Sequence, residues 1–285
     1  MSDNQMTWEE AVQWLKSQPD RQDLVKACYY DDSVLEAAQR FVESEEWQAV
    51  YDITKDWINS KSAAKVLDLG AGNGISSYAF AIAGCRVTAL EPNPSNIVGA
   101  GAIAKLAKES NLDIEVIQSF GEEIPFADNS FDIVHGRQVL HHAENLPQLC
   151  QEAARVLRPK GLFITTREHV ISQPQDLEIF LQTHPLHQLY GGENAFLLKQ
   201  YYHAISQAGL TLIASYGQYQ SVINYAPISR SQYQENITNK LKKYLGLQLA
   251  GWLGSQPSFI KLVSNIHTWR DRTAGRLYSF VAIKS

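Results

Sequence analysis

The sequence predicts an α/β fold in which a mostly parallel sheet of seven strands carries helices on both faces. From Lys65 onward, short apolar runs alternate with helical stretches, a pattern that favours parallel strand pairing through right-handed crossovers. A glycine-rich turn joins the first of these strands to an Ala-rich helix. The 285 residues, 45% of them hydrophobic and 19% charged, suffice for a substantial buried core.

Seven segments have the composition and length of buried strands and end at turn residues. These segments are residues 66–69, 86–90, 114–118, 131–134, 161–166, 210–215 and 276–283. The helices predicted between them are residues 75–83, 94–109, 146–156 and 196–208. A polar stretch that follows Arg167 and runs to Gly192 interrupts the alternation.

Helical segments extend this core at two places. At the N-terminus, Thr7 and Glu10 form a predicted capping box at the start of an amphipathic helix. Before the last strand lies a segment too long for a hairpin loop, which we interpret as an inserted helical cap. We expect the N-terminal helices and this cap to form a lid over the carboxyl edge of the sheet. The predicted parts are residues 1–60 (N-terminal helices), 61–216 (core), 217–274 (cap) and 275–285 (final strand of the core sheet).

Charge and residue usage argue against several classes of protein. The net charge of −5 disfavours a broad nucleic-acid-binding surface. No apolar run reaches the roughly 20 residues that span a bilayer, and the N-terminus is acidic and amphipathic, unlike a secretory signal. Three cysteines stand far apart, without metal-binding spacing. We therefore expect a cytoplasmic protein that acts on a small molecule, with neither a membrane nor a nucleic acid as partner.

The strongest motif is the glycine-rich turn at residues 68–74, Asp-Leu-Gly-Ala-Gly-Asn-Gly. Its glycines let the backbone turn sharply after a strand and approach a ligand closely. Glu91 ends the next strand, near the spacing at which an acidic residue accepts hydrogen bonds from ribose hydroxyls. One alternative is a tight strand–helix connection without a ligand. The other is a nicotinamide or flavin site, whose glycines are usually spaced G-x-G-x-x-G rather than G-x-G-x-G as here.

Four stretches of the chain resemble the class I S-adenosylmethionine-dependent methyltransferases, particularly the small-molecule branch of the methyltransferase type 11 kind. They are VLDLGAGNG at 66–74, ALEPNP at 89–94, IPFADNSFDIVHGRQVLHH at 124–142 and ARVLRPKGLFITT at 154–166. The resemblance covers the cofactor half of the chain and fades outside it. It implies a Rossmann-like fold, S-adenosylmethionine as cofactor, S-adenosylhomocysteine as product, and a small-molecule methyl acceptor.

The resemblance also assigns cofactor contacts. The residues implied are Asp68 (amino group), Gly70, Ala71 and Gly72 (methionine part), Glu91 (ribose hydroxyls), Asn93 (adenine) and His135 (end of the fourth strand). Family members often carry an acidic residue after the third strand that meets the adenine amino group, and Phe120 stands there instead. Backbone groups of Gly121, the face of Phe120 or the carboxylate of Glu122 would replace that contact. Core packing is the alternative role for Phe120.

Histidines at the end of the fourth strand supply candidate catalytic bases, because an imidazole titrates near neutral pH. His141 is the first candidate and His142 the second. The Leu-His-His pattern is common in the resembling family whatever the acceptor. Packing or hydrogen bonding at a helix start is therefore the alternative role for both.

The residues predicted to contact the acceptor are Arg137, Glu168, His169, His187 and Tyr190. Arg137 has the planar fork that binds a carboxylate or phosphate, with a surface ion pair as the alternative. Glu168 and His169 follow the fifth strand, at the sheet edge where α/β proteins bind substrates. His187 and Tyr190 lie in a loop segment rich in imidazoles.

No metal site is expected, because His184 and His187 have no further convincing ligands nearby in the sequence. The function predicted is methyl transfer from S-adenosylmethionine to a small acceptor, at an oxygen of a sugar or secondary metabolite. Transfer to carbon or nitrogen remains open. Two other classes stay as alternatives: a non-catalytic S-adenosylmethionine-binding module and a nicotinamide oxidoreductase.

Overall fold

The computed structural model describes residues 6–285 and confirms the predicted α/β architecture. Residues 1–5 of the expected N-terminal helical segment lie outside the described residues. The strands are β1 (Lys65–Leu69), β2 (Arg86–Leu90), β3 (Ile114–Ile117), β4 (Phe131–Arg137), β5 (Leu157–Ile171), β6 (Phe196–Leu197), β7 (Leu210–Tyr216) and β8 (Arg276–Lys284). Their order is β3-β2-β1-β4-β5-β8-β7, with β6 paired to β5. β8 runs antiparallel to β5 and β7, and the other pairs are parallel.

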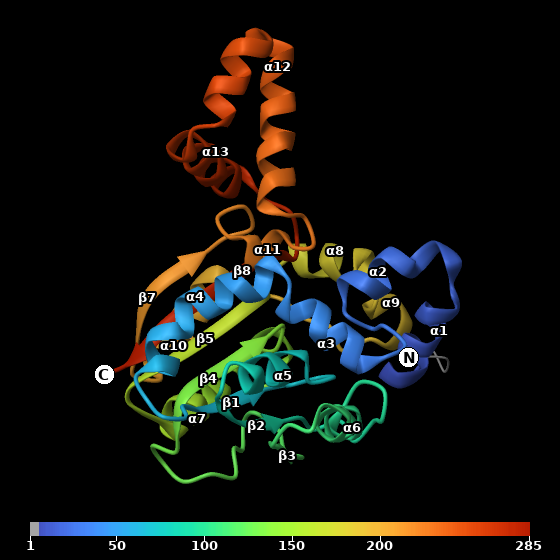
Figure 1. The fold of residues 1–285 in the computed structure, drawn as a ribbon, viewed down its shortest axis with the longest axis vertical. Coiled ribbons are helices and arrows are strands. Elements are labelled where there is room, and N and C mark those ends of the chain that lie inside the picture. Colours follow the sequence, from blue (N-terminus) through green and yellow to red (C-terminus); the bar gives the residue numbers. More distant parts are fainter. Residues whose placement is uncertain (1–5) are drawn as a thin grey trace.

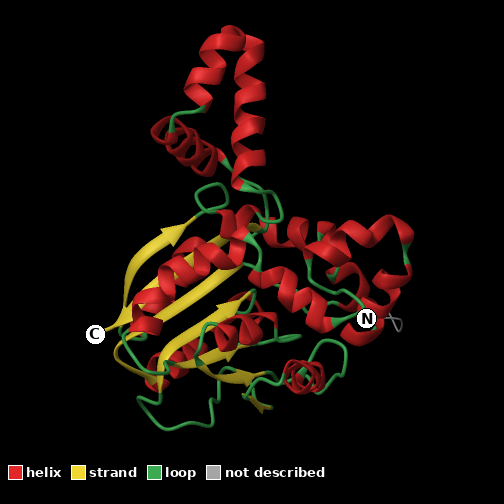
Figure 2. Cartoon of the chain, viewed as in Figure 1, coloured by secondary structure: helices red, strands yellow, loops and turns green. Residues whose placement is uncertain are grey.

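The sheet has eight strands where the sequence predicted seven, because the start of the expected helix 196–208 forms the two-residue strand β6. Helices cover both faces of the sheet (Figures 1 and 2). On one face lie α3 (Val34–Val42), α4 (Glu45–Asn59), α5 (Ile75–Ile82) and α6 (Ala100–Ser110). On the other lie α7 (Leu146–Val156), as predicted, and α10 (Leu198–Gln207).

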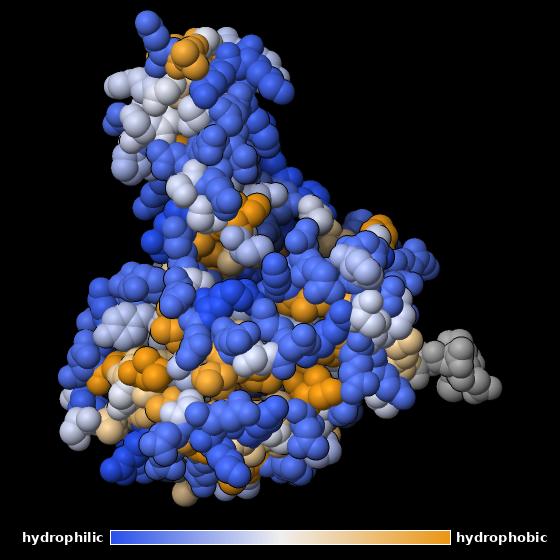
Figure 3. All heavy atoms as spheres, turned by 45° about the vertical axis from the view of Figure 1, so that its right-hand side comes forward, coloured by the Kyte–Doolittle hydropathy of each residue, from blue (hydrophilic) through white to orange (hydrophobic). Residues whose placement is uncertain are grey.

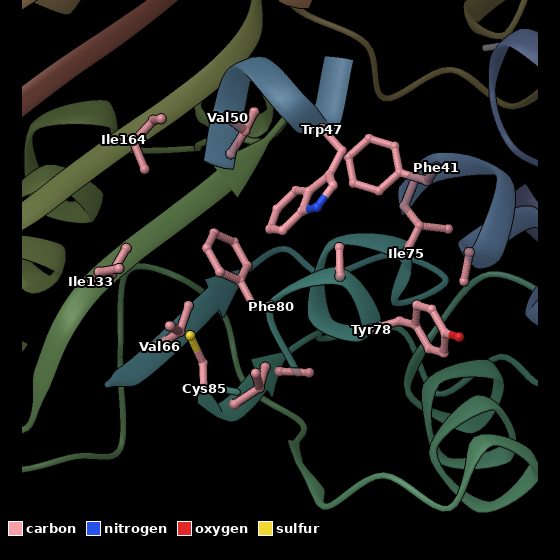
Figure 4. Close-up of a cluster of buried hydrophobic side chains, with 14 of the residues drawn as sticks. Phe41, Trp47, Val50, Val66, Ile75, Tyr78, Phe80, Cys85, Ile133 and Ile164 are labelled. Carbon is pink, nitrogen blue, oxygen red and sulfur yellow. The ribbon is translucent and has the colours of Figure 1, made fainter. Parts of the chain in front are cut away.

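An aromatic cluster fills the core on the α3–α6 face (Figure 4). Trp47 packs edge-on against Phe80, with ring centroids 4.9 Å apart, and lies 5.9 Å from Phe41. These three rings come from α4, α5 and α3, and they cover Val66 on β1. The helices α3 and α4 therefore share one core with the sheet.

The helix α6 begins at Ala100 and not at Pro94 as predicted. Before it, Asn93 Oδ1 accepts a hydrogen bond from Ser95 N at 2.9 Å, and the carbonyl of Asn93 accepts one from Ala100 N at 2.7 Å. These bonds fold the segment after Pro94 into a loop, since the local side-chain bond competes with helical pairing. The loop stays at the carboxyl end of β2.

The strand β5 is longer than predicted, because it continues through Arg167 to Ile171. Its polar end pairs with β8, with Glu168 opposite Tyr278 and Val170 opposite Arg276. The sequence pattern predicted the end of the strand at Thr166 because charged residues seldom lie inside a sheet. Here they are buried because other parts of the chain supply their partners.

The carboxyl edge of the sheet is covered by small helices from two distant parts of the chain. They are α1 (Trp8–Ser17), η1 (Pro19–Arg21), α2 (Gln22–Ala27), α8 (Asp176–Thr183) and α9 (His187–Tyr190). The predicted capping box is confirmed: Glu10 N donates to Thr7 Oγ1, and Thr7 N donates to Glu10 Oε2. Leu15, Val25 and Leu186 form the apolar cluster that joins these segments.

The insertion at 217–274 contains α11 (Val222–Tyr225), α12 (Arg230–Gly254) and α13 (Pro257–Arg270). Figure 1 shows α12 projecting from the sheet and turning back at its outer end, where Gly246 has non-helical backbone angles (φ 74°, ψ 170°), before α13 follows. Large side chains on the insertion are more than half exposed, among them Tyr244, Leu247, Trp252 and Trp269. Figure 3 shows hydrophobic residues at the outer end of the insertion. Within residues 6–285, none of the helices has the length and apolar character needed to cross a membrane.

Candidate active site

A cleft opens at the carboxyl edge of β1 and β4, between the glycine-rich turn and the N-terminal helices. Its lining residues are Trp8, Leu24, Cys28, Tyr30, Asp68, Gly70, Ala71, Gly72, Asn73, Ile75, Ser76, Val98, Arg137, Gln138, His141, His142, His184, Pro185, Leu186, Tyr190 and Glu193. The insertion 217–274 contributes none of them. In the described residues the N-terminal helices and segment 184–193 therefore cover the cleft, and the insertion does not reach it; the expected lid stays a prediction.

The glycine-rich turn presents its backbone to this cleft. Gly70 and Gly72 have φ angles of 60° and 58°, in the left-handed region. A Cβ at Gly70 would clash with Val139 Cγ2, whereas a Cβ at Gly72 would meet no atom of residues 6–285 within 4 Å. The space beside Gly72 is thus open for a ligand.

We expect Gly72→Ala to weaken cofactor binding with little loss of fold. The left-handed backbone makes alanine unfavourable by about 1–2 kcal/mol, and the added methyl group occupies space at the cleft wall. Gly209→Ala is the matched control, because Gly209 has a φ of 78°, has no atom near its Cβ position and does not line the cleft. Both variants should lower the melting temperature similarly, and only Gly72→Ala should weaken S-adenosylhomocysteine binding in calorimetry. If the two variants bind S-adenosylhomocysteine equally well, the cofactor does not lie beside Gly72.

Asp68 lies at the cleft wall, and each of its two carboxylate oxygens has a polar partner inside the protein. Its Oδ1 lies 3.0 Å from His135 Nδ1, and its Oδ2 accepts from Ser77 Oγ at 2.6 Å. His135 is buried, does not line the cleft, and packs edge-on against Phe80 with centroids 5.2 Å apart. The structure therefore makes His135 a positioning residue for Asp68, in place of the expected cofactor contact.

Glu91 joins the two loops that follow β1 and β2. Its Oε2 accepts a hydrogen bond from Gly72 N at 2.8 Å, and its Oε1 accepts one from Asn93 N at 2.9 Å. Burial raises the pKa of Glu91 to about 7, although both backbone donors favour the ionised form. The carboxylate expected to hold the ribose is thus bonded directly to the glycine-rich turn; it is buried behind that turn and is not itself among the residues that line the cleft.

The residues predicted to lie near the adenine have different surroundings. Phe120 is 67% exposed, so core packing is not its role, and its face is free for stacking. Gly121 lies against Leu149 and Leu69, where a Cβ would come within about 3.1 Å of both. Glu122 Oε1 accepts from Glu144 N at 3.0 Å. Glu122 therefore holds the backbone ahead of α7, which leaves Asn93, Phe120 and Gly121 as the candidates for adenine contact.

His141 stands between two carboxylates at the end of η2 (Leu140–His142). Its Nδ1 lies 2.7 Å from Glu168 Oε2, and its Nε2 lies 3.7 Å from Glu193 Oε2. Although burial opposes the charged form, these two carboxylates raise the pKa of His141 to about 9. Glu168 also accepts the backbone N–H groups of Val139 and His141, at 3.3 and 3.1 Å. Glu168 is fully buried behind the cleft and positions His141, instead of contacting an acceptor as predicted.

Glu193 is the centre of a second group of polar side chains. Its Oε1 accepts from Tyr190 OH at 2.6 Å and lies 3.9 Å from His184 Nδ1, while its Oε2 lies 3.9 Å from His142 Nε2. Burial and the charge of His141 lower the pKa of His142 to about 4. Burial acts against ionisation of Glu193, but the imidazoles around it bring its pKa well below the usual value. Tyr190 and His142 line the cleft, consistent with their predicted places.

Three other predicted substrate residues differ from expectation. Arg137 lines the cleft, but its Nε donates to Glu46 at 2.7 Å, so it forms an ion pair with a buried carboxylate, which differs from the surface ion pair that was the alternative. His169 is buried behind the cleft, with Nδ1 2.7 Å from the carbonyl oxygen of Gly275. His187 lines a separate surface depression beside α8, and His184 lies in the cleft instead.

Sequence reasoning missed several cleft residues: Trp8, Cys28, Tyr30, His184 and Glu193. Glu193 had a usable signal, because it is an acidic residue beside a glycine pair in a histidine-rich segment. The N-terminal residues had only the amphipathic pattern of their helices. That pattern indicates burial but does not show which edge of the sheet is covered.

The strand order β3-β2-β1-β4-β5, the glycine-rich turn after β1 and the acidic residue at the end of β2 define a Rossmann-like cofactor-binding domain. Residues 67–165 match the methyltransferase domain family. This part of the chain is therefore a methyltransferase domain of the class I, S-adenosylmethionine-dependent type.

Similar proteins transfer methyl groups to different kinds of atom, by their names. A ubiquinone biosynthesis O-methyltransferase of Rickettsia conorii is 34% identical over 106 residues, which are 37% of this chain and 35% of that protein. A glycine/sarcosine/dimethylglycine N-methyltransferase of Actinopolyspora halophila is 26% identical over 193 residues, 67% of this chain and 32% of that protein. This chain thus spans about a third of the length of these two curated relatives.

Solved structures share the fold at lower identity. A geranyl diphosphate C-methyltransferase from Streptomyces coelicolor A3(2) has a TM-score of 0.56 and 16% identity. The match covers 84% of this chain and 76% of that chain. At this identity the likeness shows the fold alone, and the methyl acceptor has to be argued from the site.

Proposed function

We propose that this chain transfers a methyl group from S-adenosylmethionine to a small-molecule acceptor bound in the cleft. The observation that carries the proposal is the direct bond from Gly72 N to Glu91 Oε2 beside an open glycine wall. A turn that can approach a ligand and a carboxylate that can accept hydrogen bonds from two hydroxyl groups lie side by side, as a nucleoside that carries an amino acid on its sulfur requires. The match of residues 67–165 to the methyltransferase domain family supports the same donor.

The donor would lie along the carboxyl ends of β1 and β2. Glu91 would accept the ribose hydroxyls, the turn at Gly70 and Gly72 would pass under the methionine part, and Asp68 would hold its amino group. Phe120, exposed after β3, is the candidate for stacking on the adenine. Methyl transfer from a sulfonium is an in-line displacement, and aligning the two reactants can supply about 7–11 kcal/mol of barrier lowering.

The acceptor would lie at the other end of the cleft, against His141 and Glu193. A hydroxyl group can be bound there from both sides, because an imidazolium donates and a carboxylate accepts a hydrogen bond. This polar end favours an oxygen acceptor on a polar small molecule such as a sugar or a secondary metabolite. Transfer to carbon or nitrogen, as the names of the N- and C-methyltransferase relatives allow, is the alternative.

The test is isothermal titration of the full chain with S-adenosylmethionine and S-adenosylhomocysteine, with NAD as the comparison ligand. We expect micromolar one-to-one binding of the two adenosyl ligands and no comparable binding of NAD. Polyhydroxylated acceptors are then screened for S-adenosylhomocysteine release. Tighter binding of NAD, or no binding of S-adenosylhomocysteine, would overturn the proposal; donor binding without turnover of any acceptor would favour a non-catalytic module.

A further inference from the structure

Three potential metal ligands from distant parts of the chain converge beside the cleft. They are His141 at the end of η2, His169 in β5 and Glu193 before β6, all buried. One ligand atom from each lies within 4.8 Å of the other two. None of these pairs is close in sequence, so the spacing rules for metal sites could not reveal them.

Both imidazoles are held in the orientation that a metal ligand requires. His141 Nδ1 is bonded to Glu168 and His169 Nδ1 to the carbonyl oxygen of Gly275, each at 2.7 Å. Bonds to a carboxylate or carbonyl on one ring nitrogen fix the tautomer and leave the other nitrogen as a ligand. His169 Nε2 is that other nitrogen, and it is buried without a hydrogen-bond partner among residues 6–285.

Glu193 also has one oxygen free for such a role. Tyr190 OH binds its Oε1 at 2.6 Å, while its Oε2 faces His141 Nε2 at 3.7 Å. In a tetrahedral zinc site with bonds of about 2.0–2.1 Å, ligand atoms lie about 3.3 Å apart. The His141–Glu193 pair would therefore close by about 0.4 Å around an ion, and a pair at the 4.8 Å limit by about 1.5 Å.

We propose that His141 Nε2, His169 Nε2 and Glu193 Oε2 bind a divalent transition-metal cation. Two imidazoles and one carboxylate are the ligand set of catalytic zinc sites and of non-haem iron sites, which keep an open coordination position. His141 and Glu193 line the cleft, so the open position faces the space where an acceptor would bind. Resting on the proposed function, the cation would replace the Nε2 proton of His141, and the acceptor hydroxyl would coordinate the cation in place of direct hydrogen bonds to His141 and Glu193. The hydroxyl proton would pass to solvent, and the oxygen would take the methyl group from the sulfonium, which leaves as S-adenosylhomocysteine.

The test uses full-length protein that has been stripped by a chelator and then titrated with Zn²⁺, and with Co²⁺ as a visible spectroscopic probe. We expect one ion per chain and a d–d absorption spectrum of a site with nitrogen and oxygen ligands. Glu168→Gln, which weakens the hold on His141, should lower the Zn²⁺ affinity by about 10–100-fold. Binding of less than one ion per chain would overturn the proposal.

His169→Asn gives the sharpest variant, because the asparagine amide can keep the bond to Gly275 while Nε2 is lost. His203→Asn is the matched control, since His203 lies exposed on α10 and does not line the cleft. We expect His169→Asn to abolish the Co²⁺ spectrum and His203→Asn to retain it. Glu193→Gln is the second ligand variant if His169→Asn lowers the yield of folded protein. Unchanged metal binding in the folded ligand variants would refute the site.

Donor and metal binding separate the two proposals. His169→Asn should leave S-adenosylhomocysteine binding unchanged, and Glu91→Ala should leave Zn²⁺ binding unchanged. Metal binding without S-adenosylhomocysteine binding would refute the proposed function and keep the metal site. S-adenosylhomocysteine binding without metal binding would refute the metal site and keep the proposed function.

Discussion

Replacing Glu91 by alanine should weaken S-adenosylhomocysteine binding by about 100-fold or more. Two hydroxyl-to-carboxylate hydrogen bonds would be lost, each contributing about 1.5–3 kcal/mol. The variant also leaves Gly72 N and Asn93 N without the acceptor that joins their loops. Calorimetric titration of wild type and variant under the same buffer measures the effect.

Glu115→Ala is the control for this experiment. Glu115 lies exposed within the neighbouring strand β3, where it accepts a hydrogen bond from Thr88 Oγ1, whereas Glu91 follows the carboxyl end of β2. The Glu115→Ala variant should bind S-adenosylhomocysteine as tightly as the wild type does. If Glu91→Ala and Glu115→Ala bind equally well, Glu91 does not hold the ribose.

The affinity of the wild type should also rise with pH. Burial raises the pKa of Glu91 to about 7, and only the ionised carboxylate can accept both ribose hydroxyl protons. Below pH 7 the proton must be removed on binding, so the affinity should fall by about tenfold per pH unit. It should level off above pH 7. Glu91→Gln has no titrating group there and should lose this dependence; a wild-type affinity that stays flat from pH 5.5 to 8 would contradict the assigned role.

Glu46→Ala should destabilise the fold by about 3–5 kcal/mol, the effect of breaking a buried ion pair. Glu46 is 2% exposed and binds Arg137 through two nitrogens, at 2.7 and 3.3 Å, with Arg167 at 3.9 Å. Its removal leaves two guanidinium groups buried without their shared carboxylate. Urea denaturation followed by circular dichroism measures the loss.

Asp52→Ala on the same helix α4 is the matched control. Asp52 is exposed and pairs only with Lys55, at 3.2 Å. Such surface pairs contribute about 0–1 kcal/mol, so this variant should stay close to wild type. If Glu46→Ala lowers the free energy of unfolding no more than Asp52→Ala does, the Glu46–Arg137 ion pair is solvated in solution.

The fold and the donor half of the site could be predicted because their signals are local. The alternation of strands and helices follows from hydrophobic periodicity, and Gly70, Gly72 and Glu91 lie on consecutive strand ends. Parallel strands bring such ends together whatever the rest of the chain does. The strand β5 was predicted too short, because the partners that permit a buried Glu168 come from β8 and η2.

The sequence by itself determined the sheet, its helices and the loop that would bind the donor, since each depends on residues close together along the chain. Only the tertiary structure decided which groups surround the acceptor end. His141, His169 and Glu193 meet because β5 extends beside β8 and the segment before β6 folds back over the sheet edge. Their approach depends on packing between distant segments, and neither residue spacing nor periodicity records such packing.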